Sequence, residues 1–185
     1  MKVVLVHGYG IGINGTPPFK MFTNELGKEI AKVFRWEEVE PNCSRIKMLK
    51  LETQKAMDPA THMKLQDYLE EHQPDIVLGH SLGSFLIFKY LKNFKFPSSV
   101  KKLIFVQGIL DRKFVISNEN IEICNYYCPW DYALWTGMFF HKVLPCGLFA
   151  ASDPKVKNKM FPLYKPSNLH TSSIRDKNFL KELTT

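Results

Sequence analysis

The chain has 185 residues and the composition of an ordinary globular protein: 45% are hydrophobic, 13% aromatic and 23% charged. This balance excludes a disordered, collagen-like or disulfide-scaffold protein and provides enough apolar side chains for a real core. Because two full domains would hardly fit this length, we expect one domain over residues 1–185.

The formal net charge is +7, from 25 lysine and arginine residues against 18 aspartate and glutamate residues. Such an excess could indicate a nucleic-acid or membrane partner, but those surfaces concentrate their basic residues on one element. Here the lysines run from Lys2 to Lys181, with modest clusters at residues 89–95 and 155–159. We therefore expect a solvating charge and no nucleic-acid partner.

The sequence has no signature of secretion, metal binding or membrane insertion. The four cysteines form no CxxC motif, and no histidine lies at zinc-finger spacing from them, so neither a metal nor a disulfide framework is expected. The apolar run at the N-terminus is too short for a signal peptide. The longest apolar stretch, Tyr132–Ala151, contains His141, Lys142 and Pro145, which argues against a membrane span. A cytoplasmic protein with free thiols and no integral membrane segment is the prediction.

In the first half of the chain, a strand, two helices and a short edge strand are expected. Val3–Val6 is an uninterrupted apolar run, typical of a strand buried on both faces. Thr16-Pro17 predicts a helix start, and apolar residues at steps of three and four continue to Val33. A short edge strand is expected near Arg35–Val39. Asp58-Pro59 opens a second helix, which Gln73-Pro74 ends.

Strands and helices continue to alternate in the second half. The pattern predicts a buried strand at Asp75–Leu78, then a sharp turn and a deeply buried helix over Leu82–Leu91. The other expected elements are strands at Leu103–Val106, Ile121–Tyr127 and Met160–Tyr164 and a C-terminal helix around Phe179 and Leu180. This alternation predicts an α/β three-layer sandwich with a mostly parallel sheet of five or six strands.

Gly79-His80-Ser81-Leu82-Gly83 matches the GxSxG pattern of a serine nucleophile. The pattern requires a strand before it and a helix after it, and both are expected here. Ser81 is therefore the predicted nucleophile, and the Leu82 N–H at the helix start would stabilise an oxyanion. His80 is interpreted as a structural packing or hydrogen-bonding residue.

A glycine-rich loop follows the first strand, beginning His7-Gly8-Tyr9-Gly10. Loops at the carboxyl ends of parallel strands share one edge of the sheet, so this loop should face the Ser81 turn. We predict Tyr9 as the second oxyanion donor, with Gly10 as the alternative, and place Gly8 and Gly10 in the substrate site. A GxGxxG string at residues 10–15 is the rival interpretation, but it comes late after the strand, so no dinucleotide cofactor is expected.

The base and the acid are sought after Ser81, in the chain order serine, acid, histidine. Two histidines, His141 and His170, follow Ser81, and His170 is preferred because it lies in a loop beyond the last expected strand. The preferred acid is Asp131, which follows the strand Ile121–Tyr127; Asp111 and Asp153 remain alternatives.

These motifs together resemble the α/β-hydrolase superfamily, and the resemblance spans the chain from His7 to His170. The segment Asn125–Leu134 is similar to the strand-and-acid segment of lipase-like members. Compact members, such as minimal bacterial lipases and the small serine hydrolases once named for retinoblastoma-protein binding, look like this chain. The resemblance implies a minimal α/β-hydrolase fold, a serine hydrolase activity and no cofactor or metal.

The chemistry expected is acyl transfer to water: cleavage of a carboxylester or thioester through an acyl-enzyme, with a small-molecule acyl substrate. The region Tyr132–Ala151 could be a lid, a pocket wall or core, and Trp135 and Phe139 are the candidate substrate-binding residues in it. The alternative is a catalytically silent binding protein on the same fold. The acyl chain, the leaving group and the oligomeric state stay open.

Overall fold

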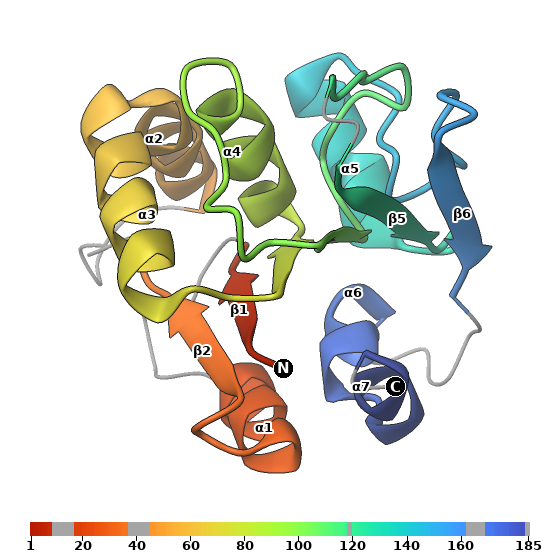
Figure 1. Ribbon diagram of the computed structural model, residues 1–185. Helices are drawn as coiled ribbons and strands as arrows, with labels where there is room; N and C mark the ends of the chain where they lie inside the picture. Colours follow the sequence, from red (N-terminus) through yellow and green to blue (C-terminus); the bar gives the residue numbers. More distant parts are fainter. Residues whose placement is uncertain (9–16, 37–44, 118–119, 162–168, 184–185) are drawn as a thin grey trace.

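The computed structural model describes residues 1–8, 17–36, 45–117, 120–161 and 169–183. Its centre is a six-stranded, all-parallel sheet in the order β2-β1-β3-β4-β5-β6 (Figure 1). The strands are β1 (Val3–Val6), β2 (Ala31–Phe34), β3 (Ile76–His80), β4 (Lys102–Val106), β5 (Glu122–Tyr127) and β6 (Val156–Met160).

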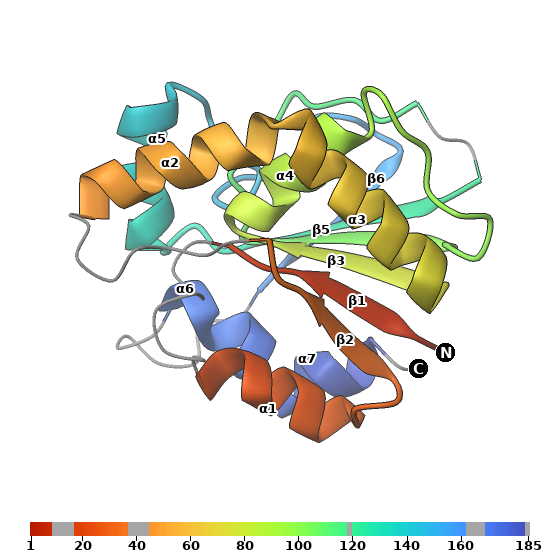
Figure 2. The same ribbon diagram turned by 90° about the vertical axis from the view of Figure 1, so that its left-hand side faces the viewer.

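Helices cover both faces of this sheet. Figure 2 shows α2, α3, α4 and α5 on one face and α1, α6 and α7 on the other. This confirms the predicted three-layer α/β sandwich with six strands. The helices are α1 (Pro17–Leu26), α2 (Arg45–Met57), α3 (Pro59–His72), α4 (Leu82–Tyr90), α5 (Tyr132–His141), α6 (Leu169–Ser172), the 3₁₀ turn η2 (Ser173–Arg175) and α7 (Lys177–Glu182).

The position of β1 inside a sheet covered on both faces explains why its sequence is apolar without interruption. Successive side chains of a strand point to opposite faces, and a sheet covered on both sides needs apolar residues on each. Val4 and Val6 pack in the core beneath α2, α3 and α4, whereas Val3 and Leu5 pack in the second core, with α1 and α7. All four side chains are buried.

The strand order reverses beside β1. The chain runs outward from β1 to β2 and then returns to place β3 on the other side of β1. Ligand sites in open parallel sheets lie at such switch points. Gly8 follows β1 and Ser81 follows β3, so both lie at this edge.

The sequence-based prediction was wrong about where the first helix ends. Apolar spacing suggested a helix as far as Val33, but α1 ends at Leu26 and Gly27 adopts a left-handed conformation with φ 85°. Val33 lies in β2, Ala31–Phe34, and residues 37–39 of the edge strand expected near Arg35–Val39 lie outside the described part. Gly27, in its left-handed conformation, follows the last helical residue, so the helix ends before the apolar spacing does.

Two further elements differ from expectation, and one matches it closely. The helix α2 was not predicted, because it buries Glu52 and Ala56 while it exposes Leu51, which leaves no clear apolar stripe. The last strand lies at Val156–Met160, earlier than Met160–Tyr164, whose residues 162–164 lie outside the described part. The helix at Asp58-Pro59 is confirmed: the Asp58 carboxylate accepts from the Ala60 N–H as an N-cap.

The region Tyr132–Ala151 is part core and part surface. It forms α5 and a following turn, and Leu134 and Leu148 are buried with Ile109 in a small separate cluster. On the outer side of α5 the side chain of Phe139 is 75% exposed.

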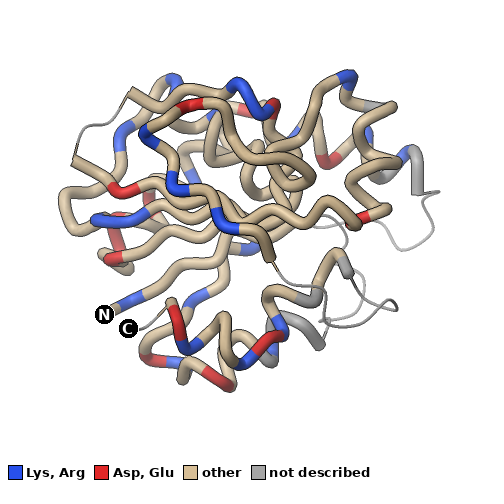
Figure 3. Tube along the Cα trace, turned by 90° about the vertical axis from the view of Figure 1, so that its right-hand side faces the viewer, with Lys and Arg blue, Asp and Glu red and all other residues tan. Residues whose placement is uncertain are grey.

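No helix of the described residues has the length and apolar character needed to cross a bilayer. Figure 3 shows basic and acidic positions interspersed over the elements of the described chain.

Candidate active site

Ser81 lies on a strained turn between β3 and α4. Its backbone has φ 53° and ψ −122°, a region that residues other than glycine rarely adopt. The turn is close-packed: a Cβ at Gly83 would lie 2.1 Å from the Val6 carbonyl oxygen, and one at Gly79 would lie 2.9 Å from the Ser84 Cα. The glycines on either side of the serine are therefore sterically required, and the strain holds the Ser81 side chain at the carboxyl edge of the sheet.

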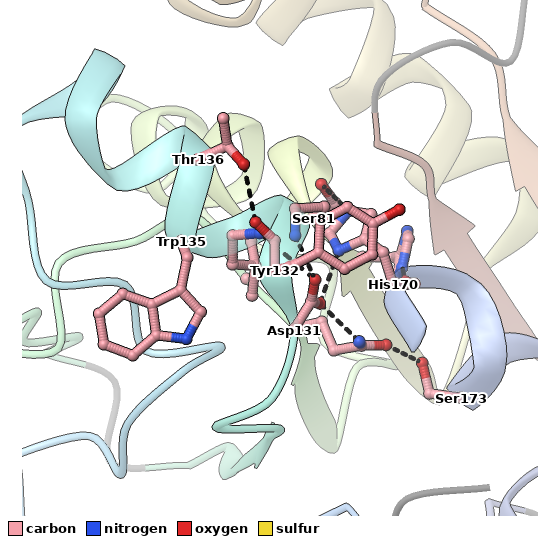
Figure 4. Close-up of polar contacts among 12 residues, drawn as sticks. Ser81, Asp131, Tyr132, Trp135, Thr136, His170 and Ser173 are labelled. Atoms are coloured by element: carbon pink, nitrogen blue, oxygen red, sulfur yellow. Dashed lines mark hydrogen bonds and ion pairs between the residues drawn. The ribbon is translucent and has the colours of Figure 1, made fainter. Parts of the chain in front are cut away.

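The structure brings Ser81, His170 and Asp131 together (Figure 4). The His170 Nε2 lies 2.8 Å from the Ser81 Oγ, and the His170 Nδ1 lies 2.7 Å from the Asp131 Oδ2. The three residues come from the β3–α4 turn, the short helix α6 and the junction of β5 with α5. They are separated by 39 to 89 residues of chain, so only the tertiary fold makes them neighbours.

The Asp131 carboxylate is fully buried and fully hydrogen-bonded. As the N-cap of α5, its Oδ1 accepts from the backbone N–H groups of Ala133 and Leu134 at 3.1 and 3.3 Å. Its Oδ2 accepts hydrogen bonds from the His170 Nδ1 and from the Gln107 amide nitrogen. Burial alone would raise the pKa of Asp131, but the charge of His170 and these hydrogen bonds outweigh it, and the pKa is lowered. The group is therefore an anion at neutral pH.

Gln107 and Ser173 belong to the same network and were not identified from the sequence. The Gln107 Nε2 donates to the Asp131 Oδ2 at 2.6 Å, and its Oε1 accepts from the Ser173 Oγ at 2.6 Å. All three side chains are buried. The available signal was that Gln107 is a polar residue directly after an apolar strand, where parallel sheets place functional side chains.

Two buried histidines support the site without touching the Ser81 hydroxyl. The His80 Nε2 donates to the His170 backbone carbonyl at 2.7 Å, which agrees with its predicted hydrogen-bonding role. The His7 Nδ1 donates to the Gly8 carbonyl, and its carbonyl accepts from the Trp36 indole. Desolvation lowers the pKa of His80 to about 3 and that of His7 to about 4, so both rings are neutral.

The predicted oxyanion donors are only partly described. Leu82 is the first residue of α4, and the N–H groups of a first helical turn have no carbonyl of their own helix to bind. Gly8 lies directly against the nucleophile, since a Cβ there would be 2.5 Å from the Ser81 Cβ. Tyr9 and Gly10 lie outside the described residues.

The alternative acids and the alternative base occupy other places. The Asp111 carboxylate accepts from the Lys113 N–H, and that of Asp153 from the Lys155 N–H, so each closes a local turn. His141 ends α5, about 15 Å along the helix from Asp131 at 1.5 Å per residue. None of the three has a described contact with Ser81.

The two aromatic residues predicted to bind substrate lie on α5. The Trp135 indole donates to the Pro129 carbonyl at 2.9 Å and packs edge-on against Phe149. Figure 4 shows this indole directed away from Ser81 and His170. Phe139 lies one turn further along the outer side of the helix. A direct contact of either residue with a bound substrate stays a prediction.

A cavity of about 600 Å³ lies between α4, the segment after β4 and the end of α5. Its lining is mainly apolar and includes Phe85, Phe88 and Ile109. Ile109 connects it to the nucleophile turn, because the Ile109 N–H donates to the Ser81 carbonyl at 3.3 Å.

Within the described ranges, no group of three or more histidine, cysteine, aspartate or glutamate side chains could hold a metal ion.

Neither a protein-family model nor a curated protein sequence matches this chain. Solved structures do. A protein from Xanthomonas campestris pv. campestris assigned to the alpha/beta superfamily of hydrolases aligns with a TM-score of 0.52 and 10% identity, over 99% of this chain and 98% of that one. The esterase domain of a Rhodothermus marinus protein has a TM-score of 0.48 and 12% identity, over 96% and 81%. A carboxylesterase from Mesorhizobium loti has a TM-score of 0.42 and 16% identity, over 94% and 85%.

The first of these similarities, with the six-stranded parallel sheet, shows the fold. The chain has a minimal α/β-hydrolase fold, as the sequence motifs predicted. Identities this low show the fold alone, and fold does not determine function. The function therefore depends on the residues at the carboxyl edge of the sheet.

Proposed function

We propose that this protein is a serine hydrolase that cleaves a carboxylester or thioester through an acyl-enzyme, with Ser81, His170 and Asp131 as its catalytic triad. The observation that carries the proposal is the continuous hydrogen-bonded series from the Ser81 Oγ through both nitrogens of His170 to the Asp131 Oδ2. A hydroxyl, an imidazole and a buried carboxylate in this order form the arrangement that activates a serine.

The proton positions follow from the acid. An ionised carboxylate only accepts hydrogen bonds, so the His170 Nδ1 carries the proton and its Nε2 lone pair faces the Ser81 hydroxyl. As the Ser81 Oγ attacks the substrate carbonyl, its proton passes to the His170 Nε2. Asp131 stabilises the resulting imidazolium, which has its second N–H directed at the carboxylate.

The rest of the cycle is acyl transfer to water. The Leu82 N–H stabilises the tetrahedral oxyanion, and Tyr9 is the proposed second donor. His170 protonates the leaving alcohol or thiol as the carbonyl–leaving-group bond breaks. Water then attacks the acyl-enzyme, gives its proton to His170, and releases the acid and the free Ser81 hydroxyl. No step needs a metal or an organic cofactor.

The cavity beside α4 is evidence in favour of a small acyl substrate. Its volume of about 600 Å³ lies in the range of sites for small molecules, and its lining is mainly apolar. Ile109 lies in its wall and contacts the Ser81 turn. We propose that the acyl chain enters here, so that a series of p-nitrophenyl esters of increasing chain length should show an optimum rather than a steady rise.

We also propose that the protein works in the cytoplasm. The support is that Cys124, Cys128 and Cys146 are free and buried, as expected in a reducing compartment.

The decisive test is labelling with a fluorophosphonate probe, which reacts with activated serine hydroxyls. The wild-type protein should be labelled at Ser81, and Ser81→Ala and His170→Ala should lose both the label and ester hydrolysis. Ser84→Ala is the matched control, because Ser84 lies one turn away and donates to the Gly79 carbonyl. A folded wild-type protein that takes no label would contradict the proposal and favour a catalytically silent binding protein.

A further inference from the structure

Gln107 has an unusual backbone that directs its side chain at the acid. It is the first residue after β4, its φ is 48°, and its N–H donates to the Tyr126 carbonyl at 2.9 Å. Gly147 packs so closely behind it that a Cβ there would lie 2.4 Å from the Gln107 carbonyl carbon. A left-handed conformation at a residue with a side chain costs on the order of 1 kcal/mol or more and persists where surrounding contacts enforce it.

Two described partners determine the orientation of the Gln107 amide. Because the Asp131 carboxylate accepts only, the amide nitrogen must face the Oδ2, at 2.6 Å, and the amide oxygen must face the Ser173 hydroxyl, at 2.6 Å. The reversed amide would place two oxygens against each other. The same Asp131 oxygen also accepts from His170 at 2.7 Å, so Gln107 contacts the atom that holds the base.

Ser173 adds a second connection to the base. It lies three residues after His170, in η2, and its bond to Gln107 links the segment carrying His170 to the acid independently of the His170–Asp131 contact. Gln107, Asp131 and Ser173 are all fully buried, so water cannot replace a missing partner. Figure 4 shows this series running from Ser173 to the Asp131 carboxylate.

We propose that Gln107, held by Ser173, is a positioning residue. Its amide orients the Asp131 carboxylate toward His170 and stabilises the negative charge of that carboxylate by a hydrogen bond. The proposal rests on the proposed function. Its consequence is electrostatic as well as geometric: a donor on the Oδ2 withdraws charge from the oxygen that stabilises the His170 imidazolium. Removing the donor should therefore leave the buried carboxylate with one hydrogen bond fewer and free to turn away from His170.

The first variant is Gln107→Leu. We expect kcat to fall by roughly tenfold to a hundredfold, the effect of losing a hydrogen bond to a charged group, with KM changed by less than about threefold. Among the described residues, His80 also faces His170, with the two ring centroids 5.1 Å apart, and its pKa of about 3 keeps it neutral near neutral pH.

The second variant, Gln107→Glu, keeps the shape and distinguishes position from packing. A protonated carboxyl can still donate to Asp131, but an ionised one repels it, because two carboxylates at this distance cannot both ionise easily. We expect activity near the wild-type level at the low end of the pH range and a loss of activity with rising pH, where the wild type is constant. Asn158→Asp is the matched control: its amide bonds to Asn125 and Ala151, away from the triad.

Ser173→Ala provides a variant that removes one oxygen and is expected to fold. It should lower kcat by several-fold, and Gln107→Leu combined with Ser173→Ala should be no slower than Gln107→Leu alone, because Ser173 acts through Gln107. Thermal unfolding followed by circular dichroism checks that each variant is folded before its kinetics are compared.

The outcomes separate this proposal from the function on which it rests. A wild-type protein that neither takes the fluorophosphonate label nor hydrolyses esters would overturn both. An active wild type with an unchanged pH profile in Gln107→Glu, or with additive losses in the double variant, would overturn the role of Gln107 alone.

Discussion

The two carboxylate oxygens of Asp131 have separate roles, one in capping α5 and one in the proposed triad. Its Oδ1 caps α5 through the Ala133 and Leu134 N–H groups, and its Oδ2 faces His170 and Gln107. The helix therefore orients the carboxylate, and its positive N-terminal end favours the anion. A single residue thus couples the stability of α5 to the geometry of the proposed triad.

Two substitutions at Asp131 should separate these roles. Asp131→Asn keeps an N-capping oxygen but loses the charge, so kcat should fall by about a thousandfold or more while the free energy of unfolding changes little. Asp131→Ala should lose the same activity and also at least about 2 kcal/mol of stability, because α5 loses its cap and the buried Gln107 amide loses its acceptor. Ester hydrolysis and urea unfolding measure the two effects. Asp111→Asn and Asp153→Asn are the controls; an equal loss of activity in either would contradict the choice of Asp131.

At the scale of elements, the nucleophile turn depends on how closely α4 approaches β1. Gly83 is the contact point, since a Cβ there would lie 2.1 Å from the Val6 oxygen and 2.3 Å from the His7 oxygen, both backbone atoms. Backbone cannot yield as a flexible side chain can. The approach brings the start of α4, with its Leu82 N–H, to the end of the strand that precedes Gly8.

Gly83→Ala should therefore destabilise the protein by at least about 3 kcal/mol or prevent folding. Gly137→Ala is the matched control in the interior of α5, where the new Cβ would meet only the Ile109 side chain at 3.8 Å. An alanine there should stabilise the protein by up to about 1 kcal/mol, because it restricts the unfolded chain and favours helix. Urea unfolding of both variants makes the comparison; equal effects would contradict the steric argument.

At the scale of the whole molecule, two buried histidines make the fold sensitive to acid. The folded pKa values of His7 and His80 are about 4 and about 3, well below the usual 6.5, chiefly through desolvation. Below pH 6.5 the unfolded chain takes up protons at these positions, whereas the folded protein does not. Stability is therefore complete above pH 6.5 and is lost as the pH falls toward the folded pKa values.

The free energy of unfolding should decrease between pH 6.5 and 5, with each histidine contributing a slope approaching about 1.4 kcal/mol per pH unit. Urea titrations at half-unit intervals measure it. His80→Gln should retain a hydrogen-bond donor toward the His170 carbonyl and remove that residue's share of the slope. A slope that is the same in wild type and variant would show that His80 is not the group that titrates.

How far each part could be predicted depended on the range of the interactions involved. The strand Val3–Val6, the helix opened by Asp58 and the GxSxG turn are governed by local periodicity, capping and sterics, and all were predicted. The helix α2 was missed because its burial of Glu52 comes from packing against other elements rather than from an apolar stripe. The end of α1 was misplaced because one glycine outweighed a helical spacing.

By itself, the sequence determined the class of the fold, and chain order indicated Ser81, Asp131 and His170 as the residues to examine, because strand-to-helix motifs and buried strands are local properties of the chain. Only the tertiary structure decided that these three side chains lie within hydrogen-bonding distance and that Gln107 and Ser173 join them. Gln107 and Ser173 are 66 residues apart and share no motif. Their contact depends on how a strand end and a C-terminal turn pack against the same buried carboxylate, and no local pattern encodes that.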